Sequence, residues 1–177
     1  MKKIITIFLL IPTFTMAQLT KKELKIISKA QSEITKESDK FSGELNFESP
    51  TFGKGIAALV QKPIKFIKSI DKDGNTRQYM RITTTGLTLN IDGKGFIVLF
   101  DDGTRIEKKD AEVDYKNESG TAAWRYSVFT TISDEELEIF ANKKVDGFKL
   151  YIYEGRFYPK NETIKLMGYA RGILAAN

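Results

Sequence analysis

Hydrophobic and polar residues alternate in short runs along the middle of the chain, and this alternation predicts β-strands. The runs cover residues 45–48, 63–70, 77–84, 87–91, 95–100, 111–115, 122–132 and 148–157. In the fourth run, Leu87, Leu89 and Ile91 share one face. The run 95–100 is apolar on both faces, so we expect it to be the central strand, covered on both sides.

Asp-Gly pairs separate several of these runs, at 73–74, 92–93 and 102–103. An Asp-Gly pair between two strand patterns is typical of a β-hairpin, because glycine accepts the positive φ that tight hairpin turns require. Repeated hairpins predict a sheet that is mostly antiparallel.

Two segments change to helical spacing. Ser133 is followed three residues later by Glu136, which is a capping box, and an apolar stripe follows it, so a short helix is predicted near 133–143. The same type of N-terminal pattern opens a more loosely specified helix within residues 20–34.

A last helix is predicted near 162–175. Its Gly168 and Gly172 lie four residues apart, so both fall on one face and would allow another backbone to approach closely. These elements together predict an α+β fold that is mainly antiparallel β, sandwich-like or curled, with residues 18–177 forming a single β-rich domain.

The first 17 residues have the pattern of a secretory signal peptide. Lys2 and Lys3 precede an apolar run over 4–11, and a small-residue exit ends at Ala17. The apolar run is shorter than the ~20 residues that span a bilayer. We therefore expect cleavage after Ala17, no transmembrane segment in the mature chain, and a periplasmic or secreted location.

The amino-acid composition excludes several kinds of catalytic and metal-binding site. The chain has no cysteine and no histidine, which excludes disulfides, thiol nucleophiles, histidine-based triads and ordinary zinc sites. Carboxylate chemistry and a Ser–Lys arrangement remain. The formal net charge is +5, but basic residues are interspersed with acidic ones, so no nucleic-acid partner is expected. No cofactor is predicted.

Acidic residues occur in pairs and triplets that could serve glycan hydrolysis, which needs two carboxyl groups facing each other across a sugar. Asp101 and Asp102 fall at a predicted hairpin, while Glu135, Glu136 and Glu138 fall in the first turns of a predicted helix. Negative charge is stabilising at a helix N-terminus. The structural interpretation is therefore favoured over a catalytic pair.

The segment around residue 71, which is predicted above to form a hairpin turn, can also be interpreted as a calcium-binding loop. Asp71, Asp73 and Asn75 supply oxygen ligands at the first, third and fifth positions of an EF-hand pattern. The sixth position, however, is Thr76 instead of glycine, and the twelfth is Ile82 instead of glutamate. A hairpin turn is favoured, with these three residues kept as weak metal candidates.

Four aromatic residues are the candidate ligand-binding residues, namely Trp124, Tyr126, Tyr151 and Tyr153. Aromatic side chains exposed on a sheet could stack on sugars or grip a peptide. Tyr151 and Tyr153 flank Ile152, which we expect to face inward, so the two tyrosines should face outward. The alternative, favoured most for Trp124, is that these rings belong to the core.

The order of elements resembles that of small exported bacterial proteins containing a domain of unknown function. The resemblance covers about residues 39–158, through the segment KGFIVLFDDGTRI, the Trp-Tyr strand, the Ser-capped helix and the segment FKLYIYEGRF. It implies a secreted single domain and no assigned activity.

The leading hypothesis is an exported, non-catalytic domain with a binding or accessory role at the cell envelope, where its partner could be a glycan or a protein. One alternative is a carboxylate-dependent glycan hydrolase. Another is a carrier of a small apolar ligand, which would need an internal cavity lined by Phe66, Phe96 and Phe100.

Overall fold

A computed structural model describes residues 19–50, 64–117, 123–156 and 161–177. The predicted signal peptide lies outside these ranges. The described residues form three helices and two antiparallel sheets, so the predicted α+β class is confirmed. The helices are α1 (Lys21–Ser32), α2 (Asp134–Asn142) and α3 (Asn161–Ala175).

One sheet has six strands and the other has four. In spatial order, the first contains β1 (Thr35–Ser38), β2 (Leu45–Glu48), β3 (Ile64–Ile70), β4 (Thr76–Gly86), β8 (Trp124–Thr131) and β7 (Asp114–Asn117). The second contains β10 (Tyr153–Arg156), β9 (Val145–Leu150), β5 (Lys94–Phe100) and β6 (Arg105–Glu112). Neighbouring strands within each sheet are antiparallel throughout the described residues.

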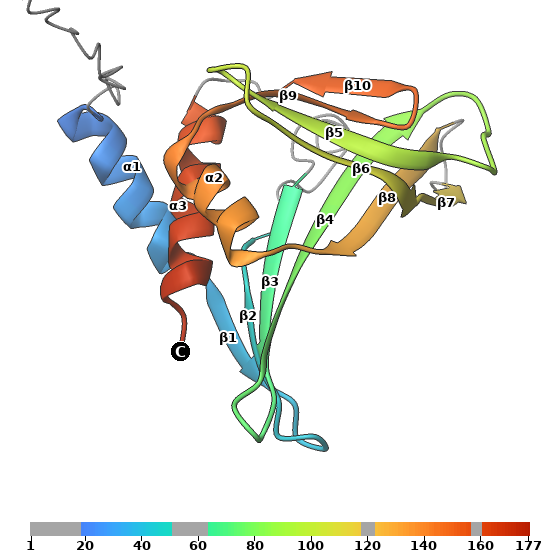
Figure 1. The fold of residues 1–177 in the computed structure, drawn as a ribbon. Coiled ribbons are helices and arrows are strands. Elements are labelled where there is room, and N and C mark those ends of the chain that lie inside the picture. The colour runs from blue at the N-terminus through green and yellow to red at the C-terminus, as the bar shows by residue number, and fades with distance from the viewer. Residues whose placement is uncertain (1–18, 51–63, 118–122, 157–160) are drawn as a thin grey trace, which may run out of the picture.

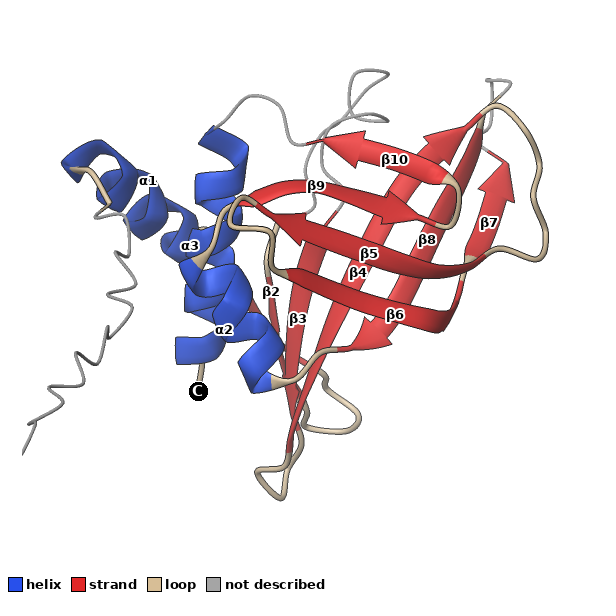
Figure 2. Ribbon diagram, turned by 45° about the horizontal axis from the view of Figure 1, so that its top comes forward, coloured by secondary structure: helices blue, strands red, loops and turns tan. Residues whose placement is uncertain are grey.

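The four-stranded sheet lies across β4 and β8, and the helices gather at the other end of the molecule (Figures 1 and 2). Alternate side chains of both sheets point into the space between them and are fully buried there, among them Phe66, Met80, Ile82, Val98, Tyr126, Val128 and Leu150. This is the sandwich-like arrangement that period-2 alternation predicts when one face of each sheet is covered.

Helix α2 closes the end of this core with one aromatic side chain. The ring of Phe140 makes edge contacts with Phe66 and Phe100, at centroid distances of 5.0 and 5.1 Å. All three rings are at most 1% exposed, and Phe96 is 2% exposed. Phe140 therefore occupies the space beside Phe66 and Phe100 in which an internal apolar ligand was expected to bind.

Helix α1 packs on α3 where the two glycines lie. A Cβ atom on Gly168 would come within 2.6 Å of the Ala30 Cβ and 2.7 Å of the Ile27 carbonyl oxygen. On Gly172 it would come within 2.5 Å of the Ile34 Cδ1. The close approach predicted from the glycine spacing is thus confirmed.

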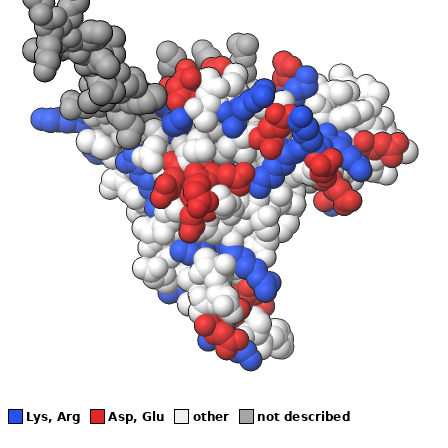
Figure 3. All heavy atoms as spheres, in the orientation of Figure 1, with Lys and Arg blue, Asp and Glu red and all other residues white. Residues whose placement is uncertain are grey.

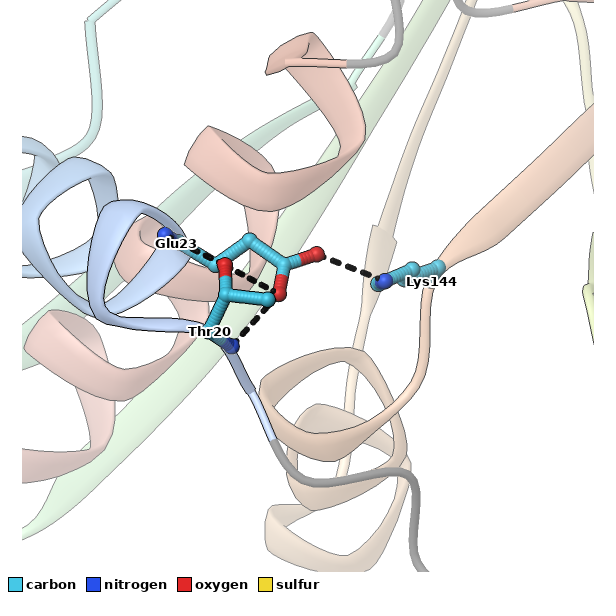
Figure 4. A network of polar contacts seen from close by, with 3 residues as sticks. All are labelled: Thr20, Glu23 and Lys144. Carbon is cyan, nitrogen blue, oxygen red and sulfur yellow. Dashed lines mark hydrogen bonds and ion pairs between the residues drawn. The ribbon is translucent and has the colours of Figure 1, made fainter.

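The N-terminus of α1 is tied to the start of β9 by a polar network (Figure 4). Thr20 and Glu23 form a reciprocal capping box, in which the Thr20 backbone N–H donates to Glu23 Oε2 at 2.8 Å. The other oxygen, Glu23 Oε1, accepts from Lys144 Nζ at 2.8 Å. The Lys144 ammonium and the Thr20 donors together lower the pKa of Glu23 to about 2.

Other local predictions are also confirmed. The capping box of Ser133 and Glu136 opens α2, and α2 and α3 fall within two residues of their predicted limits. Asp-Gly turns join β3 to β4 and β5 to β6, with positive φ angles at Gly74 and Gly103. Each of these features is specified by residues close together in the sequence.

The strand predicted at 87–91 is wrong, and so is the hairpin at 92–93. Residues 87–93 form an irregular connection from β4 in one sheet to β5 in the other. Leu87, Leu89 and Ile91, which the alternation placed on one face of a strand, are all exposed. Because the two flanking strands belong to different sheets, no ladder can form across this connection.

The prediction of one continuous strand over 148–157 is also wrong. A tight turn at Tyr151 and Ile152 divides it into β9 and β10, which pair with each other. The turn reverses which residues face inward: Ile152 is 54% exposed, whereas Tyr153 packs against the core. Tyr151 makes the turn with a left-handed backbone, at φ 53°.

Strand β5 is central in its sheet, as predicted, but it is covered on one face only. Val98 and Phe100 are buried between the sheets, while Leu99 on the opposite face is 41% exposed. The apolar run at 95–100 therefore leaves part of its hydrophobic surface on the outside of the molecule.

Candidate functional site

The four predicted aromatic residues lie on β8, on β10 and at the turn between β9 and β10. The structure brings two of them together, since the rings of Tyr126 and Tyr153 stack with centroids 4.6 Å apart and planes inclined by 28°. Tyr126 is fully buried and Tyr153 is partly buried. For Tyr126 the core interpretation is therefore the one the structure supports.

The two hydroxyl groups hold the connection 87–93 from inside. Tyr126 Oη and Tyr153 Oη both donate to the Thr88 carbonyl, the second at 2.8 Å. Asn90 donates two hydrogen bonds to the same hydroxyl oxygens, from its backbone N–H to Tyr126 Oη at 3.0 Å and from Nδ2 to Tyr153 Oη at 2.6 Å. Burial, together with the bond to Tyr126, raises the pKa of Tyr153, which keeps its hydroxyl a neutral donor.

The inward bonds hold the backbone of the connection, and most of its residues are exposed to solvent. The Thr88 carbonyl and Asn90 make the inward contacts, while Leu87, Leu89 and Ile91 are 81%, 44% and 58% exposed and Thr88 is exposed as well. Water-exposed leucine and isoleucine are ordinary when scattered, but here three lie within residues 87–91 of one connection that hydrogen bonds hold in place.

Two further exposed apolar side chains lie on neighbouring elements. Ile152 is at the β9–β10 turn, directly before Tyr153, and Tyr115 is on β7. We call the set of Leu87, Leu89, Ile91, Tyr115 and Ile152 the distal apolar surface. In Figure 3 the molecule is uncharged over the end of β4, at the upper right of the view.

Contacts around Gly86 show that these elements converge. Gly86 pairs with Trp124 in the β4–β8 ladder, and a Cβ atom on Gly86 would lie 2.3 Å from the Tyr153 ring. The Trp124 ring in turn makes an edge contact with Tyr115, at 6.1 Å between centroids. Glycine at position 86 thus lets β10 approach β4 next to the connection.

Tyr151 lies apart from the other three aromatics. Its ring packs 3.2 Å from the place where a Cβ on Gly93 would be, and its backbone N–H donates to the Gly95 carbonyl at 2.9 Å. It lines a shallow hollow on the outer face of the four-stranded sheet. The four aromatic residues predicted from the sequence therefore lie in two separate regions.

Asp71 organises the β3–β4 turn through its own oxygens. Oδ1 accepts from the backbone N–H groups of Asp73 and Asn75, each at 2.9 Å, and Oδ2 accepts from Asn75 Nδ2 at 2.9 Å. These bonds, led by that from the Asn75 side chain, lower the pKa of Asp71. The hairpin predicted for this segment is confirmed, and its three oxygen-bearing residues bond to one another within the turn.

Three of the acidic residues considered for hydrolysis, Asp102, Glu135 and Glu136, have structural partners. Asp102 pairs with Lys143 at 2.7 Å, and the bond from Lys143, with the Thr104 backbone N–H next, lowers its pKa to about 2. Ser133 lowers the pKa of Glu135, and Glu136 closes the α2 capping box. A general acid for glycan hydrolysis needs a raised carboxyl pKa, so these shifts run in the opposite direction.

No family model, curated protein or solved structure matches this chain. Among the residues that the structure describes, no helix is both long and apolar enough to cross a lipid bilayer.

Sequence reasoning missed the polar residues that order this end. Thr88 and Asn90 gave no sign of their role, because their partners lie 36 to 65 residues further along the chain. Gly86, placed directly after a strand pattern, was the one local indication of a close approach. The alternation over 87–91 did identify the apolar side chains, but it assigned them to a strand.

Proposed function

We propose that this chain is an exported, non-catalytic binding domain whose distal apolar surface docks a protein partner in the cell envelope. The observation that carries the proposal is the ordered connection 87–93, in which two tyrosine hydroxyls bind the inward side while Leu87, Leu89 and Ile91 face solvent. The leader predicted over residues 1–17 supports the location.

Energetics favour a protein partner for such a surface. Burying apolar area contributes about 25 cal/mol per Å², and a leucine or isoleucine moved fully from water into an interface contributes roughly 1.5–3 kcal/mol. A segment already held in one conformation loses less entropy on binding than a mobile one. The hydrogen bonds of Tyr126 and Tyr153 supply this ordering before a partner arrives.

The two alternative functions have less support. Phe140 packs between Phe66 and Phe100, which counts against an internal apolar ligand. The lowered pKa values of Asp102 and Glu135 count against their use as a general acid. A binding role requires neither a cavity nor a perturbed acid.

A pair of double variants tests the proposal. Leu87→Asp with Leu89→Asp places charge on the distal apolar surface, while Leu24→Asp with Leu99→Asp places the same charge on exposed leucines elsewhere. Tagged proteins are expressed in the native host, cross-linked in intact cells and purified. We expect the wild type and the second variant to retain one discrete adduct that the first variant loses at least tenfold.

The proposal fails if both double variants retain the adduct equally, or if the wild type forms none. Thermal unfolding of each purified variant excludes misfolding as the cause of a loss, because all four leucines are at least 41% exposed and should tolerate the change.

A further inference from the structure

A shallow hollow of about 240 Å³ lies on the outer face of the four-stranded sheet. It is separate from the distal apolar surface, although Tyr151 borders both the hollow and the end of the connection at Gly93. Side chains from β5, β6, β9 and the β9–β10 turn line it, chiefly Lys94, Ile97, Glu107, Lys109, Lys149 and Tyr151.

Backbone geometry creates the hollow. The β5–β6 ladder shifts register between Lys94 and Phe96, and Gly95 between them has φ +81°. A Cβ atom on Gly95 would lie 2.8 Å from the Lys109 carbonyl oxygen, so glycine is required there. The Gly95 carbonyl accepts from the Tyr151 N–H, which holds the turn against the bulge.

The charges around the hollow favour an anion. Lys109 Nζ lies 3.9 Å from Glu107 and Lys149 Nζ lies 3.4 Å from Glu154, and the two lysine side chains are 79% and 45% exposed. Surface ion pairs of this kind contribute only about 0–1 kcal/mol to stability, so either lysine can leave its glutamate to bind an anion. Lys94 forms no ion pair within the described part of the chain. Three ammonium groups thus border a hollow with one lining carboxylate.

We propose that this hollow binds an anionic sugar residue of a glycan, with the anion being a carboxylate or a phosphate. Tyr151 and Ile97 provide an aromatic wall and an apolar base for the sugar ring, and Lys94, Lys109 and Lys149 provide point charges for its anionic group. The volume is below the range of about 300–1,000 Å³ for drug-sized ligands, which suits a single sugar unit of a longer chain.

The test measures binding of three defined probes by NMR titration of the purified chain from Gln18 to Asn177. The probes are trigalacturonate, glucose 6-phosphate and neutral maltotriose. We expect trigalacturonate, glucose 6-phosphate or both to shift resonances of Lys94, Gly95 and Tyr151, and maltotriose to shift them at least tenfold less at equal concentration. Binding of only one anionic probe identifies which anion the site takes.

Matched lysine variants separate a site from general attraction. Lys94→Gln with Lys109→Gln removes charge at the hollow, and Lys40→Gln with Lys72→Gln removes the same charge at exposed turns of the other sheet. The first pair should weaken binding at least tenfold and the second less than twofold. The inference is overturned if maltotriose binds as well, if both pairs have the same effect, or if no probe binds. Cross-linking of the distal apolar surface is scored separately, so either proposal can fail alone.

Discussion

The rings of Tyr126 and Tyr153 stack at 4.6 Å across the gap between the two sheets, and both hydroxyls donate to the same carbonyl, that of Thr88. One tyrosine comes from the six-stranded sheet and the other from the four-stranded sheet. This pair therefore joins the sheets and also orders the connection that carries the exposed leucines.

Removing one hydroxyl should loosen the connection without disturbing the ring stack. Tyr126→Phe loses the donor to Thr88 and the acceptor for the Asn90 N–H. We expect a loss of about 1–2 kcal/mol in the free energy of unfolding and faster amide exchange over residues 87–93. Tyr115→Phe, at a residue that is 44% exposed, is the control and should change neither quantity. Unchanged exchange in Tyr126→Phe would show that the hydroxyls do not order the connection.

Phe140 should be among the most costly residues to truncate. It is fully buried and contacts Phe66 and Phe100, so Phe140→Ala leaves a cavity between α2 and both sheets. The expected loss in the free energy of unfolding is about 3–5 kcal/mol, measured by urea denaturation. Phe129→Ala, at a position 48% exposed, should cost much less. Similar losses in the two variants would contradict the packing described for α2.

The two glycines of α3 should differ in their tolerance of alanine. At Gly168 the new Cβ meets the backbone of α1, including the Ile27 carbonyl oxygen at 2.7 Å. At Gly172 it meets the far end of the Ile34 side chain, which can rotate away. Gly168→Ala should lower the free energy of unfolding by about 1–3 kcal/mol, and Gly172→Ala should cost less. The reverse order in thermal unfolding would mean that α1 is placed differently on α3.

Acid should weaken the attachment of α1 through Glu23. Lys144 and Thr20 lower its pKa from 4.5 to about 2, so the folded state holds its proton less tightly than the unfolded state. The stabilisation is therefore complete above about pH 4.5 and is lost as the pH falls toward 2. Because the pair is partly exposed, we expect about 1 kcal/mol. The difference in stability between wild type and Glu23→Gln should be present at pH 6 and disappear near pH 2.

Glu37→Gln, at an exposed position on β1, is the control for this titration. A wild-type advantage over Glu23→Gln that is the same at pH 6 and near pH 2 would show that the ion pair with Lys144 does not contribute. Urea denaturation at several pH values gives both comparisons.

Features encoded by neighbouring residues were predictable from the sequence. The capping box at Ser133 and Glu136 and the Asp-Gly turn before Asn75 each involve residues at most a few positions apart. Their hydrogen bonds form within a single turn, so no information about the rest of the fold is needed.

Features that depend on distant partners were not predictable. Nothing local shows that β4 and β5 enter different sheets, because a strand pattern does not specify its pairing partner. The turn at Tyr151 lacks the glycine, proline or asparagine that marks most tight turns, and it forms against the bulge at Gly95. The four aromatic residues predicted from the sequence are consequently not among the exposed residues of the distal apolar surface, although Tyr126 and Tyr153 hold its connection in place.

Site-specific photo-cross-linking can show whether a protein partner contacts the distal apolar surface. A photoreactive phenylalanine analogue is placed at Leu89 on the distal apolar surface or, in a parallel strain, at Leu99 on the outer face of β5. Both leucines are similarly exposed, at 44% and 41%, so exposure alone should give equal reaction. We expect one discrete protein adduct in the cell envelope from position 89 and none from position 99. Equal adducts from both positions, or none from position 89, would contradict this expectation.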